Sequence, residues 1–297
     1  MSVTVRVPAK VNVQLAVGAA RSDGFHDLAN IFLAVGLYDE VTVTPADELR
    51  VTCEGPDAHQ VPLDRTNLAA RAAVELAARR GIEPAVHIHI AKDIPVAGGM
   101  AGGSADGAGA LLACDTLWGT GASRAELLAL CAELGSDVPF SLVGGAALGV
   151  GRGERLTALE LGGTFHWVFA MAGRGLSTPA VFREFDRLAE SRDIPEPVAS
   201  PGLMEALAEG DPDALASAVS NDLQPAALSL FPELADTLAA GRTAGALTAL
   251  VSGSGPTTAF LTRDPESAAK VAETLRASGT CRTVRVASGP APGATVL

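Results

Sequence analysis

The chain has 297 residues, a length that favours two domains of about 150 residues each. Apolar residues make up 48% of the sequence and charged residues 19%, so the chain can bury a substantial core and disorder is not expected. Its net charge of −12 opposes binding to polymeric nucleic acid or to an anionic membrane surface. Arginine supplies almost all of the positive charge, because the sequence has three lysines, at Lys10, Lys92 and Lys270.

The four cysteines show no CxxC spacing and have no histidine at ligand spacing. A zinc site or a disulfide framework is therefore not expected. We therefore expect a reducing, cytoplasmic compartment. The first residues alternate like a strand and lack the basic and apolar regions of a signal peptide. No run of about 18 apolar residues occurs, so no membrane span is expected.

The first half of the chain mixes strands and helices. A period of two in the apolar residues predicts a pair of strands broken at Pro8, and further strands later on. The predicted strands cover 3–7, 11–17, 41–43, 49–53, 86–90 and 144–150. The predicted helices run from a Thr66 cap to Arg80, from a glycine-rich turn to about 118, and from a Ser123–Glu126 capping box to 135.

The second half has a different texture. A strand is predicted at 165–171, and residues 179–240 are mostly helical around a proline-rich interruption at 194–201. The remaining elements are predicted as strands at 247–252, 257–261 and 281–286 and a helix at 265–277. We place a domain boundary near 160, giving two α+β domains over 1–160 and 161–297. A doubly wound sheet is disfavoured, because strands and helices do not alternate regularly.

The segment 95–106 is the most informative part of the sequence. It reads Pro-Val-Ala-Gly-Gly-Met-Ala-Gly-Gly-Ser-Ala-Asp and lies between a predicted strand and a predicted helix. Glycines let consecutive N–H groups converge on an anion, and the helix that follows adds its unpaired N–H groups. The Ser104 hydroxyl could bind a phosphate oxygen or a metal ion. Taken alone, the segment is equally compatible with a flexible turn whose glycines pack a helix.

Two familiar phosphate-binding motifs do not fit this segment. A P-loop requires Gly-Lys-Ser/Thr, and no lysine lies near the turn. A dinucleotide fingerprint requires GxGxxG directly after the first strand of a βαβ unit. Two other loops are suggestive: Asp137 lies on the turn 135–140, and 251–258 is a Gly/Ser turn between apolar strands. Alone, Asp137 is more typical of an ordinary turn residue, and the second segment is typical of a hairpin.

Taken together and in order, these loops resemble the motifs of the GHMP kinase superfamily. Six segments from Ser2 to about Ala294 carry the resemblance: Pro-Ala-Lys-Val-Asn at 8–12, Arg-Ser-Asp-Gly-Phe-His at 21–26, the glycine-rich segment at 95–104, Gly-Ser-Asp-Val-Pro-Phe at 135–140, Ser-Gly-Ser-Gly-Pro-Thr at 252–257 and Gly-Pro-x-x-Gly-Ala at 289–294. Two departures are visible. Ala101 replaces a glycine that is common in relatives, and Phe25 replaces a frequent tyrosine.

The resemblance implies a two-domain GHMP kinase fold with the active site between the domains. Its N-terminal domain would be like the second domain of ribosomal protein S5, and its C-terminal domain would be ferredoxin-like. Within the superfamily, the sequence is most similar to kinases that transfer the γ-phosphoryl group of ATP to the 2-hydroxyl of a cytidine-diphosphate-linked methylerythritol. Asp137 would be the general base and Lys10 its electrostatic partner. The loop expected to bind ATP comprises Pro95, Val96, Ala97, Gly98, Gly99, Met100, Ala101, Gly102, Gly103, Ser104 and Ala105.

The cytidine end of such a substrate would be bound by aromatic groups. The resemblance assigns this role to Phe25, His26 and Phe182, because aromatic rings can stack on the two faces of a cytosine. Phe182 is equally well explained as a core residue of its helix. Asn12 and Thr178 would hold the methylerythritol and diphosphate portions.

No residue is assigned here as a metal ligand. His87 and His89 are spaced like a metal pair, but solvent-facing strand histidines are the favoured interpretation. Mg²⁺ is expected because it accompanies ATP, with Ser104 a weak candidate ligand. The partners expected are two small molecules, with no polymeric nucleic acid and no membrane, and the chain would be a monomer or a weak homodimer. Another GHMP kinase, acting on mevalonate or homoserine, and a catalytically inactive nucleotide-binding regulator are the alternatives.

Overall fold

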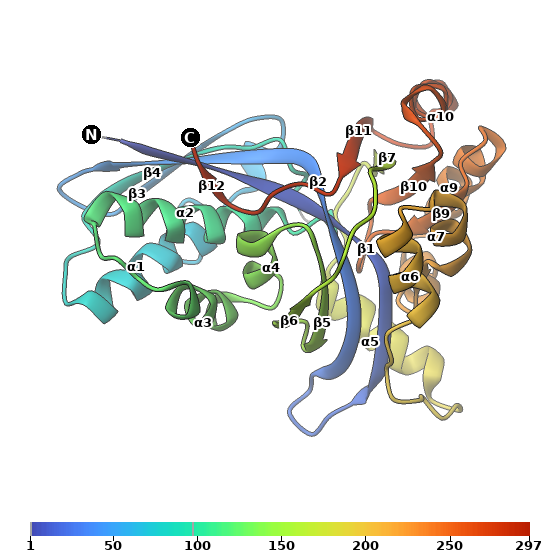
Figure 1. Cartoon of the computed structure of the whole chain (residues 1–297), viewed down its shortest axis with the longest axis horizontal. Helices are drawn as coiled ribbons and strands as arrows, with labels where there is room; N and C mark the ends of the chain where they lie inside the picture. Colours follow the sequence, from blue (N-terminus) through green and yellow to red (C-terminus); the bar gives the residue numbers. More distant parts are fainter. Residues whose placement is uncertain (1, 97) are drawn as a thin grey trace.

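Two sheets organise the computed structural model, which describes residues 2–96 and 98–297 (Figure 1). The larger sheet has eight strands in the path β12-β1-β2-β4-β3, with β5 and β8 pairing with β2 and β1, and β6 with β5. Its strands are β1 (Val3–Ala20), β2 (His26–Pro45), β3 (Arg50–Glu54), β4 (Val86–Ala91), β5 (Ala146–Gly151), β6 (Arg155–Ala158), β8 (Ser220–Asn221) and β12 (Thr295–Val296).

The longest strands, β1 and β2, form an antiparallel hairpin that crosses the middle of the molecule (Figure 1). β2 pairs with β4 through its second half and with β5 through its first half. The predicted break at Pro8 is wrong, because β1 continues through it with a shift of register between Pro8 and Ala9. A bulge lets the strand pass a residue that has no N–H to donate.

Helices cover one face of the large sheet: α1 (Leu68–Arg80), α2 (Gly102–Trp118), α3 (Arg124–Leu134) and α4 (Val138–Val143), with a short 3-10 turn at Ala58–Gln60. The small residues of α2 allow close packing, since a Cβ at Gly109 would lie 2.8 Å from Val7 and 2.9 Å from Val41. The predicted capping box of Ser123 and Glu126 is confirmed. The cap predicted for α1 is one residue off.

The cap of α1 is Asn67, whose side chain accepts a hydrogen bond from the Ala69 N–H. Thr66 instead donates both its N–H and its hydroxyl to the Asp64 carboxylate. Asparagine and threonine are both good N-cap residues, so composition alone did not separate the two neighbours. The predicted end of the helix, at Gly81, is confirmed.

The smaller sheet consists of β7 (Phe165–Met171), β9 (Thr248–Val251), β10 (Thr258–Thr262) and β11 (Thr283–Gly289) in the order β11-β7-β10-β9. All its pairings are antiparallel. Numbered within this sheet, the order is 4-1-3-2, and helices follow the first and third strands. This is the ferredoxin-like arrangement that the family resemblance predicted.

The helices of the second half are α5 (Thr178–Ala189), α6 (Pro201–Glu209), α7 (Pro212–Ala218), α8 (Gln224–Leu230), α9 (Leu234–Thr243) and α10 (Pro265–Ser278). The chain then returns to the large sheet, where β12 pairs with β1 through Val5 and Val296. The boundary near 160 stays a prediction. Across the described residues, no helix combines the length and the apolar character needed to cross a bilayer.

Candidate active site

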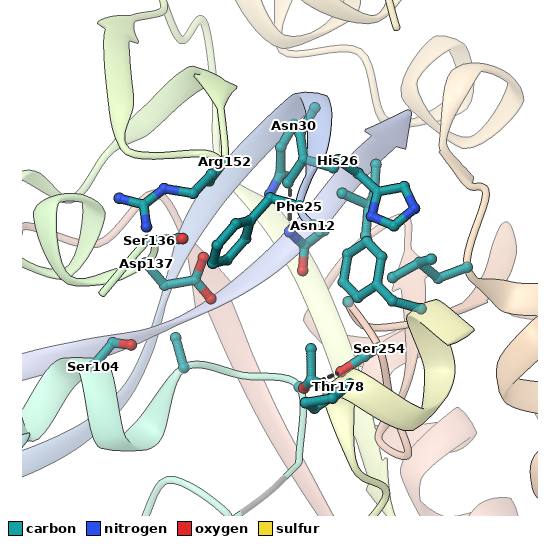
Figure 2. A pocket seen from close by; sticks show the side chains of 18 of the residues that line it. Asn12, Phe25, His26, Asn30, Ser104, Ser136, Asp137, Arg152, Thr178 and Ser254 are labelled. Atoms are coloured by element: carbon teal, nitrogen blue, oxygen red, sulfur yellow. Dashed lines mark hydrogen bonds between the residues drawn. The ribbon is translucent and has the colours of Figure 1, made fainter. Parts of the chain in front are cut away.

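A cavity of about 640 Å³ opens between the two sheets. Its walls come from β1, β2, the N-terminus of α2, the turn before α4, α5 and the β9–β10 turn (Figure 2). Most of the predicted site residues line it: Lys10, Asn12, Phe25, His26, Gly98, Gly99, Ala101, Gly102, Gly103, Ser104, Asp137, Thr178 and Phe182. Five of the six segments that carry the family resemblance therefore meet at one cavity.

The glycine-rich loop is fixed from behind by β1 and by the β9–β10 turn. The Gly99 carbonyl accepts hydrogen bonds from Lys10 Nζ at 2.9 Å and from the Ser252 hydroxyl at 3.0 Å. Gly99 has φ +76°, and a Cβ there would lie 2.1 Å from the Ser252 carbonyl oxygen, so this position requires glycine. The Gly99 carbonyl is thus held by β1 and by the β9–β10 turn.

Helix α2 begins at Gly102 without a side-chain cap. Its first N–H groups have no partner within the helix, and Gly102, Gly103 and Ser104 line the cavity. An uncapped helix N-terminus facing a cavity is a binding site for an anion, because unpaired N–H groups and the helix dipole both favour negative charge. The loop therefore has the chemistry of a phosphate site.

Four residues predicted with this loop are placed elsewhere. Met100 and Ala105 are completely buried, so their side chains do not reach the cavity. Pro95 and Val96 line a second, smaller cavity. Ala97 lies outside the described residues.

A buried charge cluster lies beneath the start of α2. Lys92 Nζ donates to the Asp39 carboxylate at 2.5 Å and to the Asp106 carboxylate at 2.8 Å. Asp39 also accepts the backbone N–H groups of Asp93 and Ile94, which fixes the strand-to-loop connection. Burial raises the pKa of Asp106 to about 7, with Lys92 opposing and Asp39 adding to the shift. The cluster thus ties α2 and the loop to the sheet.

Lys10 and Asp137 form an ion pair in the wall of the cavity. Lys10 Nζ lies 3.6 Å from Asp137 Oδ2 and donates to Asn12 Oδ1 at 2.6 Å. Burial lowers the pKa of Lys10, and the charge and hydrogen bonding of Asp137 oppose that shift. Asp137 remains 31% exposed, so its carboxylate is accessible to a molecule in the cavity. This places an acid within reach of a ligand and beside a fixed cation.

Sequence reasoning missed Asn30 on β2. Its Oδ1 accepts from Asn12 Nδ2 at 2.7 Å, which continues a buried chain of hydrogen bonds to Lys10 (Figure 2). Because a lysine can only donate, Asn12 must turn its oxygen to Lys10 and its NH₂ to Asn30. The one available signal was a polar residue inside the apolar segment 28–35.

The aromatic wall of the cavity combines a turn and a helix. Phe25 is the last residue of the β1–β2 turn, His26 is the first residue of β2, and Phe182 comes from α5. The rings of His26 and Phe182 are 4.9 Å apart, and His26 Nε2 is hydrogen-bonded to Asp186 at 2.8 Å. Phe182 also packs on the apolar core of the smaller sheet, which agrees with the core interpretation, and its contact with a base stays a prediction.

Other residues that were not predicted also line the cavity. The Thr178 hydroxyl is 2.8 Å from that of Ser254, which links α5 to the β9–β10 turn. The Arg152 guanidinium lies over the Phe25 ring, 5.3 Å from its centroid. Ser254 lies in the Ser-Gly-Ser-Gly-Pro-Thr segment that carries the family resemblance but was assigned no role, whereas no local signal in the sequence pointed to Arg152.

His87 and His89 lie on β4, away from the cavity. Both rings are hydrogen-bonded to the Thr52 hydroxyl, at 2.7 and 2.9 Å. Both side chains are half-buried. Within residues 2–96 and 98–297, no group of three or more His, Cys, Asp or Glu side chains is placed to hold a metal ion.

Comparison with known proteins shows the family. The chain matches the model of the GHMP kinases N terminal domain over residues 67–145 and that of the GHMP kinases C terminal over 203–281. It is 81% identical to 4-diphosphocytidyl-2-C-methyl-D-erythritol kinase of Streptomyces avermitilis and 80% identical to that of Streptomyces coelicolor, with complete coverage of both chains in each case.

A solved structure agrees with this assignment. The crystal structure of a 4-(cytidine 5'-diphospho)-2C-methyl-D-erythritol kinase is 34% identical, with a TM-score of 0.77, and the similarity covers 96% of this chain and 98% of that one. The predicted two-domain α+β GHMP kinase fold is confirmed. The chain therefore belongs to the 4-diphosphocytidyl-2-C-methyl-D-erythritol kinase family of the GHMP kinases.

Proposed function

We propose that this protein transfers the γ-phosphoryl group of ATP to the 2-hydroxyl of 4-diphosphocytidyl-2-C-methyl-D-erythritol, in the methylerythritol phosphate route to isoprenoids. The family supports the reaction, since the relatives carry the name of this kinase. The observation that carries the proposal is that three features needed for this reaction line one cavity. The Lys10–Asp137 pair, the uncapped start of α2 and an aromatic wall all line the same space.

Asp137 would act as the general base. The acceptor is a tertiary alcohol, a weak acid that must lose its proton as the new O–P bond forms. The carboxylate takes that proton, the bond between the γ-phosphorus and the β–γ bridging oxygen breaks, and ADP leaves. Lys10, 3.6 Å from Asp137 and held by Asn12 and Gly99, provides a positive charge beside the transferred group.

The ATP phosphates would lie at the start of α2, on the N–H groups of Gly102, Gly103 and Ser104. Phosphoryl transfer of this kind depends mainly on positioning and charge stabilisation, which a rigid loop provides. The cavity suits a Mg²⁺ ion carried by ATP rather than one held by a protein cage, because Mg²⁺ keeps several waters and needs few protein ligands. Ser104 would be its protein ligand, and the ion would offset phosphate charge.

The cytosine would stack between Phe25 and Phe182. The ring of His26 is turned to Asp186 and packs on Phe182, so it would fix the second aromatic face rather than stay free. Stacking of this kind is worth about 1–3 kcal/mol per base. Asn12 and Thr178 would contact the methylerythritol and diphosphate portions. Mevalonate and homoserine have no base and would leave this aromatic wall unused.

Net charge bears on partners as well as ligands. At −12, the chain would repel polymeric nucleic acid and anionic membranes. ATP and the cytidyl substrate are anions too, but their phosphates would meet backbone N–H groups and a few placed cations. We infer that the chain acts on small molecules as a monomer or a weak homodimer.

The deciding experiment measures ADP release with ATP and three alcohols: the cytidyl substrate, mevalonate and homoserine. We expect turnover of the cytidyl substrate at a kcat/KM at least about a hundredfold above the others, since two lost stacking contacts are worth a few kcal/mol. Turnover of mevalonate or homoserine without the cytidyl substrate would overturn the proposal. Binding of ATP without turnover of any alcohol would point to the regulator instead.

A further inference from the structure

Arg152 stands out among the cavity-lining residues because neither catalysis nor phosphate binding uses it. It lies in the turn between β5 and β6, and its guanidinium carbon is 5.3 Å from the centroid of the Phe25 ring. That distance falls within the range in which a cation is attracted to the face of an aromatic ring. Figure 2 shows Arg152 on one side of Phe25 and His26 on the other.

Phe25 needs such support. Its side chain belongs to a residue that is 49% exposed, at the end of a turn. The turn backbone is fixed, because the Asp23 carboxylate accepts from the Phe25 N–H and pairs with Arg21. These contacts hold the main chain but leave the ring free to rotate. A stacking ring that must be ordered each time a base binds loses part of its binding energy as side-chain entropy.

The position of Arg152 is itself well determined. Its backbone N–H donates to Glu154 Oε2 at 2.7 Å. The preceding residue, Gly151, pairs with Leu28 of β2, which lies three residues beyond Phe25. Glu154 Oε2 also lies 3.9 Å from Arg152 Nε, an ion pair too long for a hydrogen bond, so this acid attracts the guanidinium without occupying its N–H groups. It is therefore available to stack on the ring from a rigid neighbouring hairpin.

We propose that Arg152 is a positioning residue for the cytosine subsite: its guanidinium covers the outer face of Phe25 and presents the inner face to the base. This inference rests on the proposed function. The base would then complete a stack of guanidinium, phenyl ring and pyrimidine, with Phe182 on its far side. Arg152 would act through Phe25 and would touch neither ATP nor the reacting hydroxyl.

The test compares Arg152→Met, which keeps the length of the side chain without its charge, with Arg152→Lys, which keeps a cation. For Arg152→Met we expect KM for the cytidyl substrate to rise about two- to fivefold, the size of an exposed cation–π contact, with kcat and the KM for ATP unchanged. For Arg152→Lys, the KM for the cytidyl substrate should lie between that of the wild type and that of Arg152→Met. The matched control is Arg155→Met, which removes the same charge from an exposed residue of the same hairpin.

A double-mutant cycle separates this role from general damage. In a Phe25→Leu background, Arg152→Met should have no further effect, because the ring through which it acts is gone. Additive effects would overturn the proposal, and so would a lower KM in Arg152→Met, which would mean that the guanidinium competes with the base. In Arg152→Met, the inhibition constants of cytidine and CDP should rise by the same factor relative to the wild type. A larger loss for CDP would overturn the proposal in favour of a phosphate contact.

The same experiments distinguish failure of the inference from failure of the proposed function. If the wild-type protein does not turn over the cytidyl substrate, the proposed function is wrong. If the wild type does turn it over and Arg152→Met behaves like the wild type, the positioning role alone is wrong.

Discussion

Lys10 Nζ lies 3.6 Å from Asp137 Oδ2, and this contact joins the first strand of the large sheet to the turn before α4. The lysine is buried and hydrogen-bonded to Asn12 and Gly99, whereas the carboxylate is open to the cavity. One partner is thus fixed and the other is accessible. That asymmetry suits a base that must exchange its proton with a ligand while its charge partner stays in place.

Asp137→Asn should remove most of the activity while leaving ATP binding nearly intact. An amide fills the same space as the carboxylate but cannot accept a proton. We expect kcat to fall about 10²- to 10⁴-fold, the usual contribution of a general base, and the Kd of ATP to change by less than about twofold. Steady-state kinetics and calorimetric titration with ATP measure the two quantities. Turnover close to that of the wild type would remove Asp137 from this role.

Lys10→Met should lower kcat in the same direction. The substitution leaves Asp137 without its cation and leaves Gly99 with one fewer donor, so the loop is expected to loosen as well. We therefore expect a loss of kcat of at least about a hundredfold together with a higher KM for ATP. Lys270→Met is the matched control, because Lys270 is exposed on α10. Equal kinetics for the two lysine variants would contradict the assignment.

The loops of the site were predictable from the sequence, whereas the contacts that support them were not. Gly-rich and Gly/Ser turns have a local signature, since glycine and serine are selected by turn geometry. Thr178 and Ser254 are 76 positions apart and meet only because α5 packs beside the β9–β10 turn. Asp186 meets His26 across 160 positions. Contacts of this kind depend on tertiary packing, and a single sequence does not encode them in any local pattern.

Asn30 offers a test of one of these unpredicted supports. Asn30→Ala would leave Asn12 Nδ2 without its acceptor, so Asn12 would be free to rotate away from Lys10. We expect kcat/KM for the cytidyl substrate to fall about two- to tenfold, the value of one hydrogen bond, with the KM for ATP unchanged. Asn30→Asp keeps an oxygen acceptor at the same place and should retain more activity. If the aspartate variant loses as much as the alanine variant, the hydrogen bond is not the reason.

Local sequence patterns predicted the helices and strands better than they predicted where a strand is interrupted. The capping box before α3 was predicted correctly because Ser123 and Glu126 each accept a hydrogen bond from the backbone N–H of the other, and this pair is recognisable in the sequence. The break at Pro8 was wrong because proline removes one donor from a strand, and the long β1–β2 hairpin has enough other hydrogen bonds to absorb a bulge. Pairing with β2 continues on both sides of Pro8 and keeps β1 in the sheet. Whether β1 continues through Pro8 is thus decided by its pairing in the sheet and not by the local sequence.

Asp106 provides a prediction about pH. Its pKa in the folded protein, about 7, exceeds the ordinary value of 3.8, so the folded state binds more protons than the unfolded state between these limits. The free energy of unfolding should therefore fall as the pH rises from about 4 to about 7 and then level off, by at most about 1.4 kcal/mol per pH unit from this group. Chemical denaturation at a series of pH values measures this slope.

Asp106→Asn should flatten that slope, because the amide does not titrate. The variant is expected to be more stable than the wild type at pH 8, where the wild type buries two carboxylates around the single Lys92 ammonium. Asp236→Asn, at an exposed position of α9, is the control and should leave the slope unchanged. A wild-type protein whose stability is constant between pH 5 and 7 would contradict this account of the cluster.

Ala101 lies directly before α2 and has a left-handed backbone. With φ +61°, it caps α2 in a conformation that costs an L-residue about 1–2 kcal/mol. Ala101→Gly removes this strain, but the more flexible unfolded chain offsets about 0.5–1 kcal/mol of it. We expect a net gain in the free energy of unfolding of about 0–1.5 kcal/mol and unchanged kinetics.

Ala101→Val gives the opposite and sharper test. A β-branched residue is a true outlier at positive φ, so the start of α2 must shift or the protein must lose stability. Because the N–H groups that follow Ala101 are the proposed phosphate site, the KM for ATP should rise while the KM for the cytidyl substrate stays constant. Thermal unfolding and kinetics with each substrate varied in turn measure both effects. A valine variant with normal stability and a normal KM for ATP would show that the left-handed cap is not needed for phosphate binding.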